Sequence, residues 1–228
     1  MCLKNELGTN PPQEEGMVIN MSLAVAVKSG GMVYVGADSL VSWNNTLSVT
    51  NESQSKLWKI KGSDAVFAHS GWVVDSNIIS MSDEIIDEEY TKKAIKIKDV
   101  VNNITPKIMA LLESRGRIEN QAGIKKMHSQ FLLAHKNRVF MIETDGCVIE
   151  PNEDYISIGS GAVIADGVYQ AIKDDERLSP QQKIVKIITC ACVKDAWVNY
   201  PIKILNTRND EVITIKNETA AKRFTAVR

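Results

Sequence analysis

Two apolar runs near the start of the chain, residues 22–29 and 32–39, flank the pair Gly30-Gly31. This pattern predicts a β-hairpin with a two-residue turn. With the turn centred on the glycines, Ser22 lies opposite Ser39, and Asp38 lies beside Leu23. Strict alternation places Asp38 and Ser22 on opposite faces of the sheet, unless a bulge at Gly36 turns the carboxylate. The hairpin therefore predicts that Ser22 and Asp38 are close, without predicting that they touch.

A second hairpin is predicted from residue 55 to residue 70, with its turn at residues 61–64. A four-residue turn puts Lys56 opposite His69, and Gly71 lies two residues farther along the same face. Residues 40–53, rich in Asn, Ser and Thr, are predicted to be a loop or ragged edge strands.

Apolar residues at helical spacing predict a helix over residues 78–86 and another over 100–112, which Pro106 kinks and which ends around residues 114–116. A third helix is predicted from residues 159–161 to Ile172. The fourth begins at Ser179-Pro180, with an apolar stripe that reaches Trp197. Strands are predicted at residues 131–135, 139–143, 147–150, 155–158, 202–205 and 212–215. This order predicts an α+β fold in which two antiparallel sheets pack together between two helical layers, a four-layer αββα sandwich.

Charge and composition exclude several classes of function. The 27 basic and 28 acidic residues nearly balance, which argues against a nucleic-acid-binding protein. No apolar run is long enough to span a membrane. The three histidines are scattered and the cysteines form no CxxC pair, so no metal site and no cofactor are expected. Free thiols favour a reducing compartment, and we expect a cytoplasmic protein. The four cysteines are Cys2, Cys147, Cys190 and Cys192.

The first residues differ in character from the rest of the chain. Residues 1–20 are polar, contain Pro11-Pro12 and lack the apolar core of a signal peptide. We interpret residues 1–21 as a leader or a mis-assigned start that is disordered or removed, and residues 22–228 as one domain. This division would leave Ser22 as the first residue of the mature chain.

A serine at the first position of a chain has a base of its own. The free α-amine, with an ordinary pKa of about 7.7–8.0, can accept the hydroxyl proton near neutrality. Such a nucleophile also needs a cation near the hydroxyl, a carboxylate that holds the cation, and a backbone N–H that binds the developing oxyanion. No local signature of a Ser-His-Asp triad, such as GxSxG, competes with this interpretation.

Six motifs between residue 22 and about residue 205 resemble, in order and spacing, those of proteasome β-type subunits, a group that includes the bacterial peptidase HslV. They are SLAVAV (22–27), GADS (36–39), SKLWKI (55–60), AHSGW (68–72), IGSG (158–161) and KDA (194–196). The resemblance implies the αββα fold of N-terminal nucleophile hydrolases. It also implies a ring built from copies of this chain, hydrolysis of peptides or unfolded proteins in its chamber, and an ATP-dependent unfoldase as a possible partner.

The resemblance also implies roles for individual residues. Ser22 would be the nucleophile, where most of the family has threonine, and Lys56 would be the cation held by Asp38. The N–H of Gly71 would line the oxyanion hole. Two further residues, Ser160 and Asp195, would orient the amine and a water molecule. By position, four residues would lie near the pocket for the substrate side chain: Leu40, Trp58, His69 and Val73.

Two departures from the family pattern keep alternatives open. Val198 stands where the family often has serine, and Met21, instead of glycine, precedes Ser22. Autolysis at Met21-Ser22, or translation from Met21 followed by methionine removal, would each expose Ser22. One alternative to a threonine-type endopeptidase with a serine nucleophile is a catalytically silent ring or scaffold subunit. Another is a small-amide hydrolase with an open, monomeric site.

Overall fold

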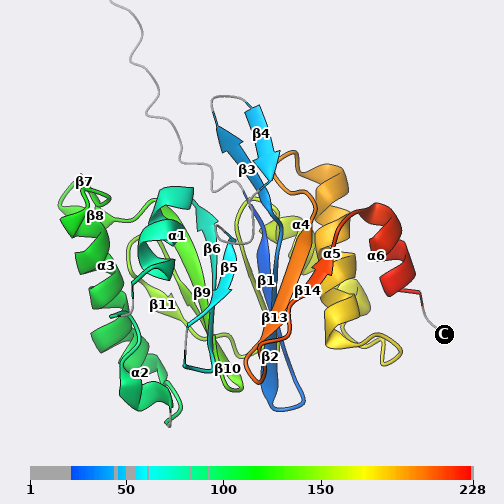
Figure 1. Cartoon of the computed structure of the whole chain (residues 1–228), viewed down its shortest axis with the longest axis horizontal. Helices are drawn as coiled ribbons and strands as arrows, with labels where there is room; N and C mark the ends of the chain where they lie inside the picture. The colour runs from blue at the N-terminus through cyan, green and yellow to red at the C-terminus, as the bar shows by residue number, and fades with distance from the viewer. Residues whose placement is uncertain are drawn as a thin grey trace, which may run out of the picture.

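Two five-stranded antiparallel sheets lie face to face at the centre of the molecule (Figure 1). The computed structural model describes residues 22–43, 46–49, 55–60, 62–82, 84–91 and 93–226, so the predicted leader, residues 1–21, lies outside the described residues. In spatial order, the first sheet contains β12 (Tyr155–Ile158), β1 (Ala24–Ser29), β2 (Met32–Ala37), β13 (Ile202–Asn206) and β14 (Ile213–Ile215). The second contains β11 (Val148–Ile149), β10 (Arg138–Ile142), β9 (Ser129–His135), β6 (Ala65–Gly71) and β5 (Leu57–Lys59).

Helices cover the outer face of each sheet, which confirms the predicted four-layer αββα fold (Figure 1). The helices α4 (Ala162–Ile172), α5 (Pro180–Lys194) and α6 (Glu218–Phe224) lie on the first sheet. The helices α1 (Val73–Ser80), α2 (Ile97–Asp99) and α3 (Thr105–Ser114) lie on the second, with the short turns η2 (Glu88–Thr91) and η3 (Val100–Ile104). Buried apolar side chains, which include Ala26, Val35 and Leu132, fill the space between the two sheets. None of the described helices has the length and apolar character needed to cross a membrane.

The first hairpin has the predicted register. Ala24 pairs with Ala37, and the N–H of Asp38 donates to the carbonyl of Leu23 at 3.2 Å. The ladder continues through Gly36 without the bulge that the sequence suggested. A Cβ atom at Gly36 would lie only 2.3 Å from Ile184 Cγ2, so glycine here allows α5 to pack closely on the sheet.

The second hairpin also forms as predicted. Leu57 pairs with Ala68, and the N–H of His69 donates to the carbonyl of Lys56 at 3.0 Å. The N–H of Ile60 donates to the carbonyl of Ala65 at 2.9 Å and closes the turn. The two hairpins therefore bring the starts of β1 and β5 and the ends of β2 and β6 to one end of the sandwich.

Several predicted helix boundaries were wrong. The first helix ends at Ser80, and the Ser82 N–H donates to the Ile79 carbonyl in a tighter final turn. The apolar residues Ile85 and Ile86 are buried beyond that turn. Helical structure continues from Ile97 to Ser114, and Pro106 lies just after the π turn η3, in which the Thr105 N–H donates to the Val100 carbonyl.

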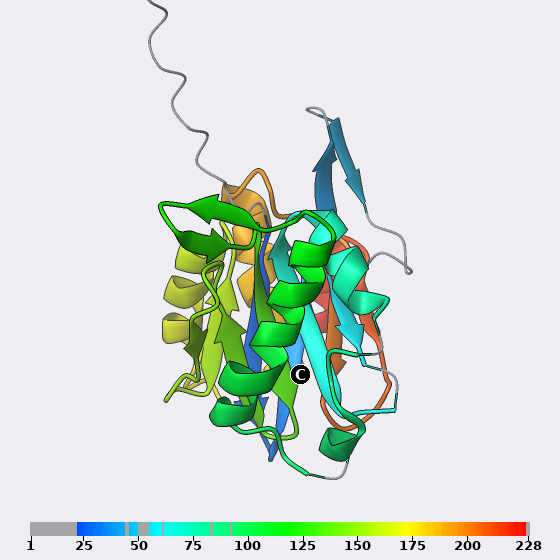
Figure 2. The same cartoon turned by 90° about the vertical axis from the view of Figure 1, so that its left-hand side faces the viewer.

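The structure also contains elements that the sequence did not predict. Trp197 lies beyond the end of α5, and α6 was not expected. Two small hairpins, β3 (Leu40–Trp43) with β4 (Thr46–Val49) and β7 (Glu119–Gln121) with β8 (Ile124–Lys126), lie at the same end of the molecule (Figure 2). The first of them agrees with one of the two predictions for residues 40–53, ragged edge strands, whereas the second was not expected.

Candidate active site

Ser22, Asp38 and Lys56 form one hydrogen-bonded cluster. Lys56 Nζ donates to Ser22 Oγ at 2.7 Å and to the two Asp38 carboxylate oxygens at 3.0 and 3.1 Å. Ser22 Oγ lies 2.9 Å from Asp38 Oδ1 and donates to it. The three residues are 0%, 1% and 3% exposed, respectively. A hydroxyl thus lies in contact with a buried cation, which stabilises negative charge on its oxygen, and with the carboxylate that holds the cation in place.

The Asp38 carboxylate is fixed from several directions. It accepts the backbone N–H groups of Leu23 at 3.0 Å, Leu40 at 2.9 Å and Asn199 at 3.3 Å. These donors come from three separate segments, which meet where β2 ends. A buried ion pair is tolerated when its remaining lone pairs are satisfied, so these N–H groups allow Asp38 to hold Lys56 inside the protein.

Residues 159–161 hold the backbone of Ser22. The N–H of Ser22 donates to Ser160 Oγ at 3.3 Å, and the Ser22 carbonyl accepts from Ser160 Oγ and from the Gly161 N–H, each at 3.3 Å. Gly159 has φ +101°, and a Cβ atom there would lie 2.3 Å from the Ser22 carbonyl oxygen. Only glycine allows this close approach. Ser160 therefore contacts the residue that the sequence predicted it would orient.

Gly71 ends β6 in a conformation reserved for glycine. Its φ is +133°, and a Cβ atom would lie 2.4 Å from the His128 carbonyl oxygen and 2.6 Å from Ser129 Oγ. The N–H of His69 points toward β5, where it meets Lys56. Backbone N–H groups alternate between the two sides of a strand. We therefore expect the Gly71 N–H to point to the same side, beyond the end of β5.

Asp195 lies just after α5. The loop that contains it contacts the Ser22 cluster through Asn199 and not through Asp195. Its carboxylate accepts the N–H of Trp197 at 2.8 Å. No hydrogen bond joins it to Ser22 or Ser160 among the described residues. The same loop provides the Asn199 N–H to Asp38 and buries Val198 beside Gly161.

The four residues predicted near a side-chain pocket lie in different environments. Leu40 is buried at the start of β3, and Val73 is half-buried at the start of α1. The Trp58 ring stacks on Phe67 with the centroids 5.6 Å apart. His69 is fully buried, 6.2 Å from the Phe131 ring. Trp58 and His69 thus pack beneath the helices of the second sheet.

A cavity of about 640 Å³ lies between β5 and the turn that joins β13 to β14. Trp58 and Leu205 line it, together with Ser55 and Leu57, which flank Lys56. Ser22 and Lys56 themselves do not line it. The cavity therefore begins beside the cluster and extends away from it.

Sequence reasoning missed a second buried carboxylate, Asp75 in α1. It is bonded to Ser129 and Arg117, from β9 and from the segment before β7. An acidic residue in the first turn of a helix indicates only a favourable interaction with the helix dipole. No signal in the sequence pointed to these partners.

The buried His69 side chain should make the stability of the folded protein depend on pH. Burial, with a further contribution from the Lys56 charge, lowers the pKa of His69 to about 3. Between pH 6.5 and pH 3 the unfolded chain therefore binds a proton that the folded chain does not, so stability falls as the pH falls. From pH 7 to pH 5 this residue should cost the wild type about 2 kcal/mol.

Chemical denaturation of the wild type and of His69→Leu at both pH values measures this cost. The variant should lose about 2 kcal/mol less on acidification. His135, whose pKa burial also lowers, is present in both proteins and cancels in the comparison. Equal losses in the two proteins would contradict the assignment of this pH dependence to His69.

Comparisons with known proteins agree with this architecture. The proteasome subunit family matches residues 21–196. The ATP-dependent protease subunit HslV of Borreliella burgdorferi strain ZS7 is 25% identical over 186 residues, which cover 82% of this chain and 96% of that protein.

Two solved structures have the same fold. Thiobacillus denitrificans BPH has a TM-score of 0.67 at 15% identity, with 81% of this chain and 96% of that chain covered. Anbu, the ancestral beta-subunit from Yersinia bercovieri, has a TM-score of 0.66 at 14% identity, with 89% and 92% covered. Because the family match extends over most of the sequence, this chain belongs to the proteasome subunit family.

Proposed function

We propose that this chain is a peptidase subunit with an N-terminal serine nucleophile. Removal of residues 1–21 exposes the α-amine of Ser22, which then serves as the general base for its own hydroxyl. The observation that carries the proposal is the contact of Lys56 Nζ with Ser22 Oγ at 2.7 Å, with Asp38 holding the lysine.

The proposed reaction begins when the α-amine accepts the Ser22 hydroxyl proton and Oγ attacks the carbonyl carbon of the scissile peptide. The Lys56 ammonium stabilises the negative charge on Oγ, and the Gly71 N–H binds the oxyanion of the tetrahedral intermediate. Collapse of the intermediate breaks the C–N bond, and the leaving amine takes the proton from the α-amine. Water then hydrolyses the ester on Ser22, with the same amine as its base, and frees the hydroxyl.

A catalytically silent subunit is the second candidate, and a specific observation favours it. The Asp195 carboxylate is engaged by the Trp197 N–H, and the nearby Val198 offers no hydroxyl to an amine. In that case the Ser22 cluster would only hold the hairpins together. Ser160, which contacts both the nitrogen and the carbonyl of Ser22, supports the active alternative.

We further propose that copies of this chain form a closed ring in the cytoplasm, and that peptides or unfolded proteins are its substrates. The relative from Borreliella burgdorferi is named a subunit of an ATP-dependent protease, which supports an assembly and an ATP-driven unfoldase as partner. A ring would separate this protein from a small-amide hydrolase, whose open site would work in a monomer.

Native mass spectrometry combined with a fluorogenic-peptide assay tests this proposal. We expect a discrete assembly of several copies at micromolar concentration, and peptide hydrolysis that co-elutes with the assembly in gel filtration. An inactive assembly would favour the silent subunit. A monomer that hydrolyses small amides but not peptides would contradict the chambered peptidase.

A further inference from the structure

A chain of hydrogen bonds connects the buried carboxylate of Asp75 to the peptide group that follows Gly71. Asp75, in the first turn of α1, is 0% exposed and accepts from Ser129 Oγ at 2.9 Å and from Arg117 Nε at 3.1 Å. Ser129 Oγ in turn accepts the N–H of Trp72 at 3.0 Å. None of these side chains contacts the Ser22 cluster in the described structure, so the carboxylate needs another explanation.

The direction of these hydrogen bonds is determined by chemistry. A serine hydroxyl has one hydrogen, and a carboxylate paired with Arg117 can only accept. Ser129 must therefore donate to Asp75, which leaves its lone pairs free to accept the Trp72 N–H. Without the carboxylate, the hydroxyl could rotate and donate elsewhere, and the Trp72 N–H would lose a well-oriented acceptor.

This arrangement holds Gly71 from its C-terminal side. Ser129 pairs with Gly71 between β9 and β6, and its hydroxyl occupies the space that a side chain at residue 71 would need. The Trp72 ring adds a second restraint, because it stacks on His128 at 4.8 Å and lies 4.6 Å from the Arg117 guanidinium. These contacts restrain the Gly71–Trp72 peptide group and, through the Gly71 Cα, limit the orientation of the preceding peptide group, which carries the Gly71 N–H.

We propose that Asp75 is a positioning residue, which acts through Ser129 to keep the Gly71 N–H aimed at the oxyanion. This inference rests on the proposed peptidase function. An oxyanion donor is effective only when it is already aimed at the place where charge develops. A small rotation of the residue that carries the donor would reduce the stabilisation of the transition state more than it would reduce the affinity for the substrate.

The test compares Asp75→Asn and Ser129→Ala with the wild-type assembly. We expect kcat for a fluorogenic peptide to fall by about 10- to 100-fold, with KM changed by less than about 3-fold. The affinity for a peptide boronate, whose tetrahedral adduct has an oxygen at the oxyanion position, should fall in parallel. The affinity for the product peptide, which forms no such adduct, should stay the same.

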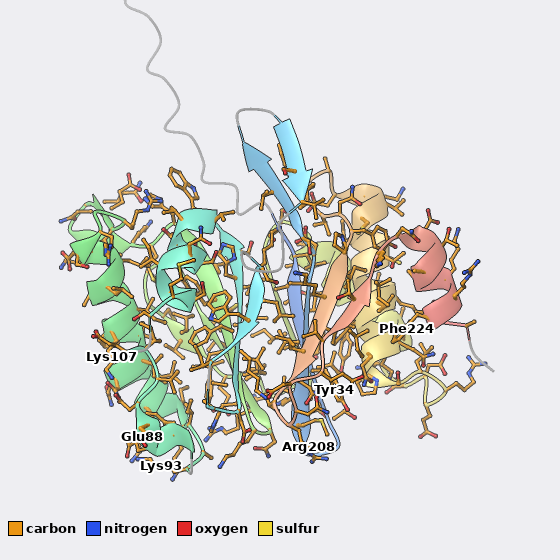
Figure 3. The ribbon with its side chains drawn as sticks, in the orientation of Figure 1. Tyr34, Glu88, Lys93, Lys107, Arg208 and Phe224 are labelled. Atoms are coloured by element: carbon orange, nitrogen blue, oxygen red, sulfur yellow. The ribbon has the colours of Figure 1, made fainter. Side chains whose placement is uncertain are left out.

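Asp87→Asn is the matched control. It removes a carboxylate that is paired with Lys107 and Asn103 in the same helical layer. Lys107 lies on the outer side of that layer (Figure 3). The kinetic constants of this variant should equal those of the wild type. Circular dichroism and native mass spectrometry check that every variant keeps its fold and assembly.

The outcomes separate this inference from the function on which it rests. An inactive wild type would refute the proposed peptidase. An active wild type together with folded variants that keep kcat within about 2-fold, or that change only KM, would overturn the role of Asp75 and leave the function intact. If Asp75→Asn does not fold, Ser129→Ala decides, because it keeps the Asp75–Arg117 ion pair and removes the hydroxyl that links Asp75 to the Trp72 N–H.

Discussion

Lys56→Ala should reduce peptide hydrolysis by about 10³-fold while the assembly persists. Lys56 is the cation in contact with Ser22 Oγ, and its loss removes both the charge and the hydrogen bond that stabilise the nucleophile. The Asp38 carboxylate would keep its three backbone N–H donors, so we expect a lower melting temperature but a folded protein. Steady-state kinetics and thermal unfolding of the purified variant measure both effects.

Lys59→Ala is the control for this experiment. Lys59 is the last residue of β5, which begins directly after Lys56, but its partner Asp210 is exposed to solvent. A surface ion pair contributes about 0–1 kcal/mol, so turnover should stay within about 2-fold of the wild type. Near-normal turnover in Lys56→Ala would contradict the proposed mechanism, and loss of turnover in both variants would indicate a general effect of strand β5.

The proximity of Ser22 and Asp38 could be predicted from sequence because one local hairpin builds it, whereas the place of Lys56 beside Ser22 followed only from the resemblance to proteasome subunits. The Gly30-Gly31 turn determines the register that brings Asp38 beside Leu23, and the turn after Ile60 determines which residue faces Lys56. Both registers follow from a few adjacent residues and the alternation of a strand. The contact between Ser22 and Asp38 then arises without a bulge, because Asp38 lies just beyond the regular ladder.

The Asp75 network could not be predicted in the same way. Asp75 and Ser129 are 54 positions apart, and their contact depends on the pairing of β6 with β9. Sequence patterning indicated a strand near residue 131 but neither its pairing with β6 nor its start at Ser129. Likewise, it did not indicate that the Trp58 ring stacks on Phe67 or that His69 is fully buried. Non-local pairing and burial determine such positions, and spacing along the chain does not reveal them.

We expect the largest effect on activity from the presence or removal of residues 1–21, which precede Ser22. While residues 1–21 remain attached, the nitrogen of Ser22 is an amide, and an amide cannot accept the hydroxyl proton. Within the structure this nitrogen donates to Ser160 Oγ at 3.3 Å, which is a position suited to an amine after cleavage. A chain expressed from Met21 should lose its methionine, because serine is small, and should hydrolyse peptides with Ser22 as its first residue.

Two variants of the chain that begins at residue 22 distinguish the contribution of the free amine to activity from that of the hydroxyl. Ser22→Thr keeps a hydroxyl of the kind that most of the family uses and should retain peptide hydrolysis. Ser22→Ala keeps the free amine and should lose at least about 10³-fold in turnover. Equal activity in Ser22→Ala and the wild type would show that another residue carries the reaction.

The most direct test of the proposal that Ser22 is an N-terminal nucleophile combines three measurements on one sample. Intact-mass analysis and Edman sequencing identify the first residue of the chains, and a peptide assay measures their turnover. We predict that turnover rises in proportion to the fraction of chains that begin at Ser22, and that chains with residues 1–21 intact have none. Full activity from chains shown to retain residues 1–21 would contradict the assignment of Ser22 as an N-terminal nucleophile.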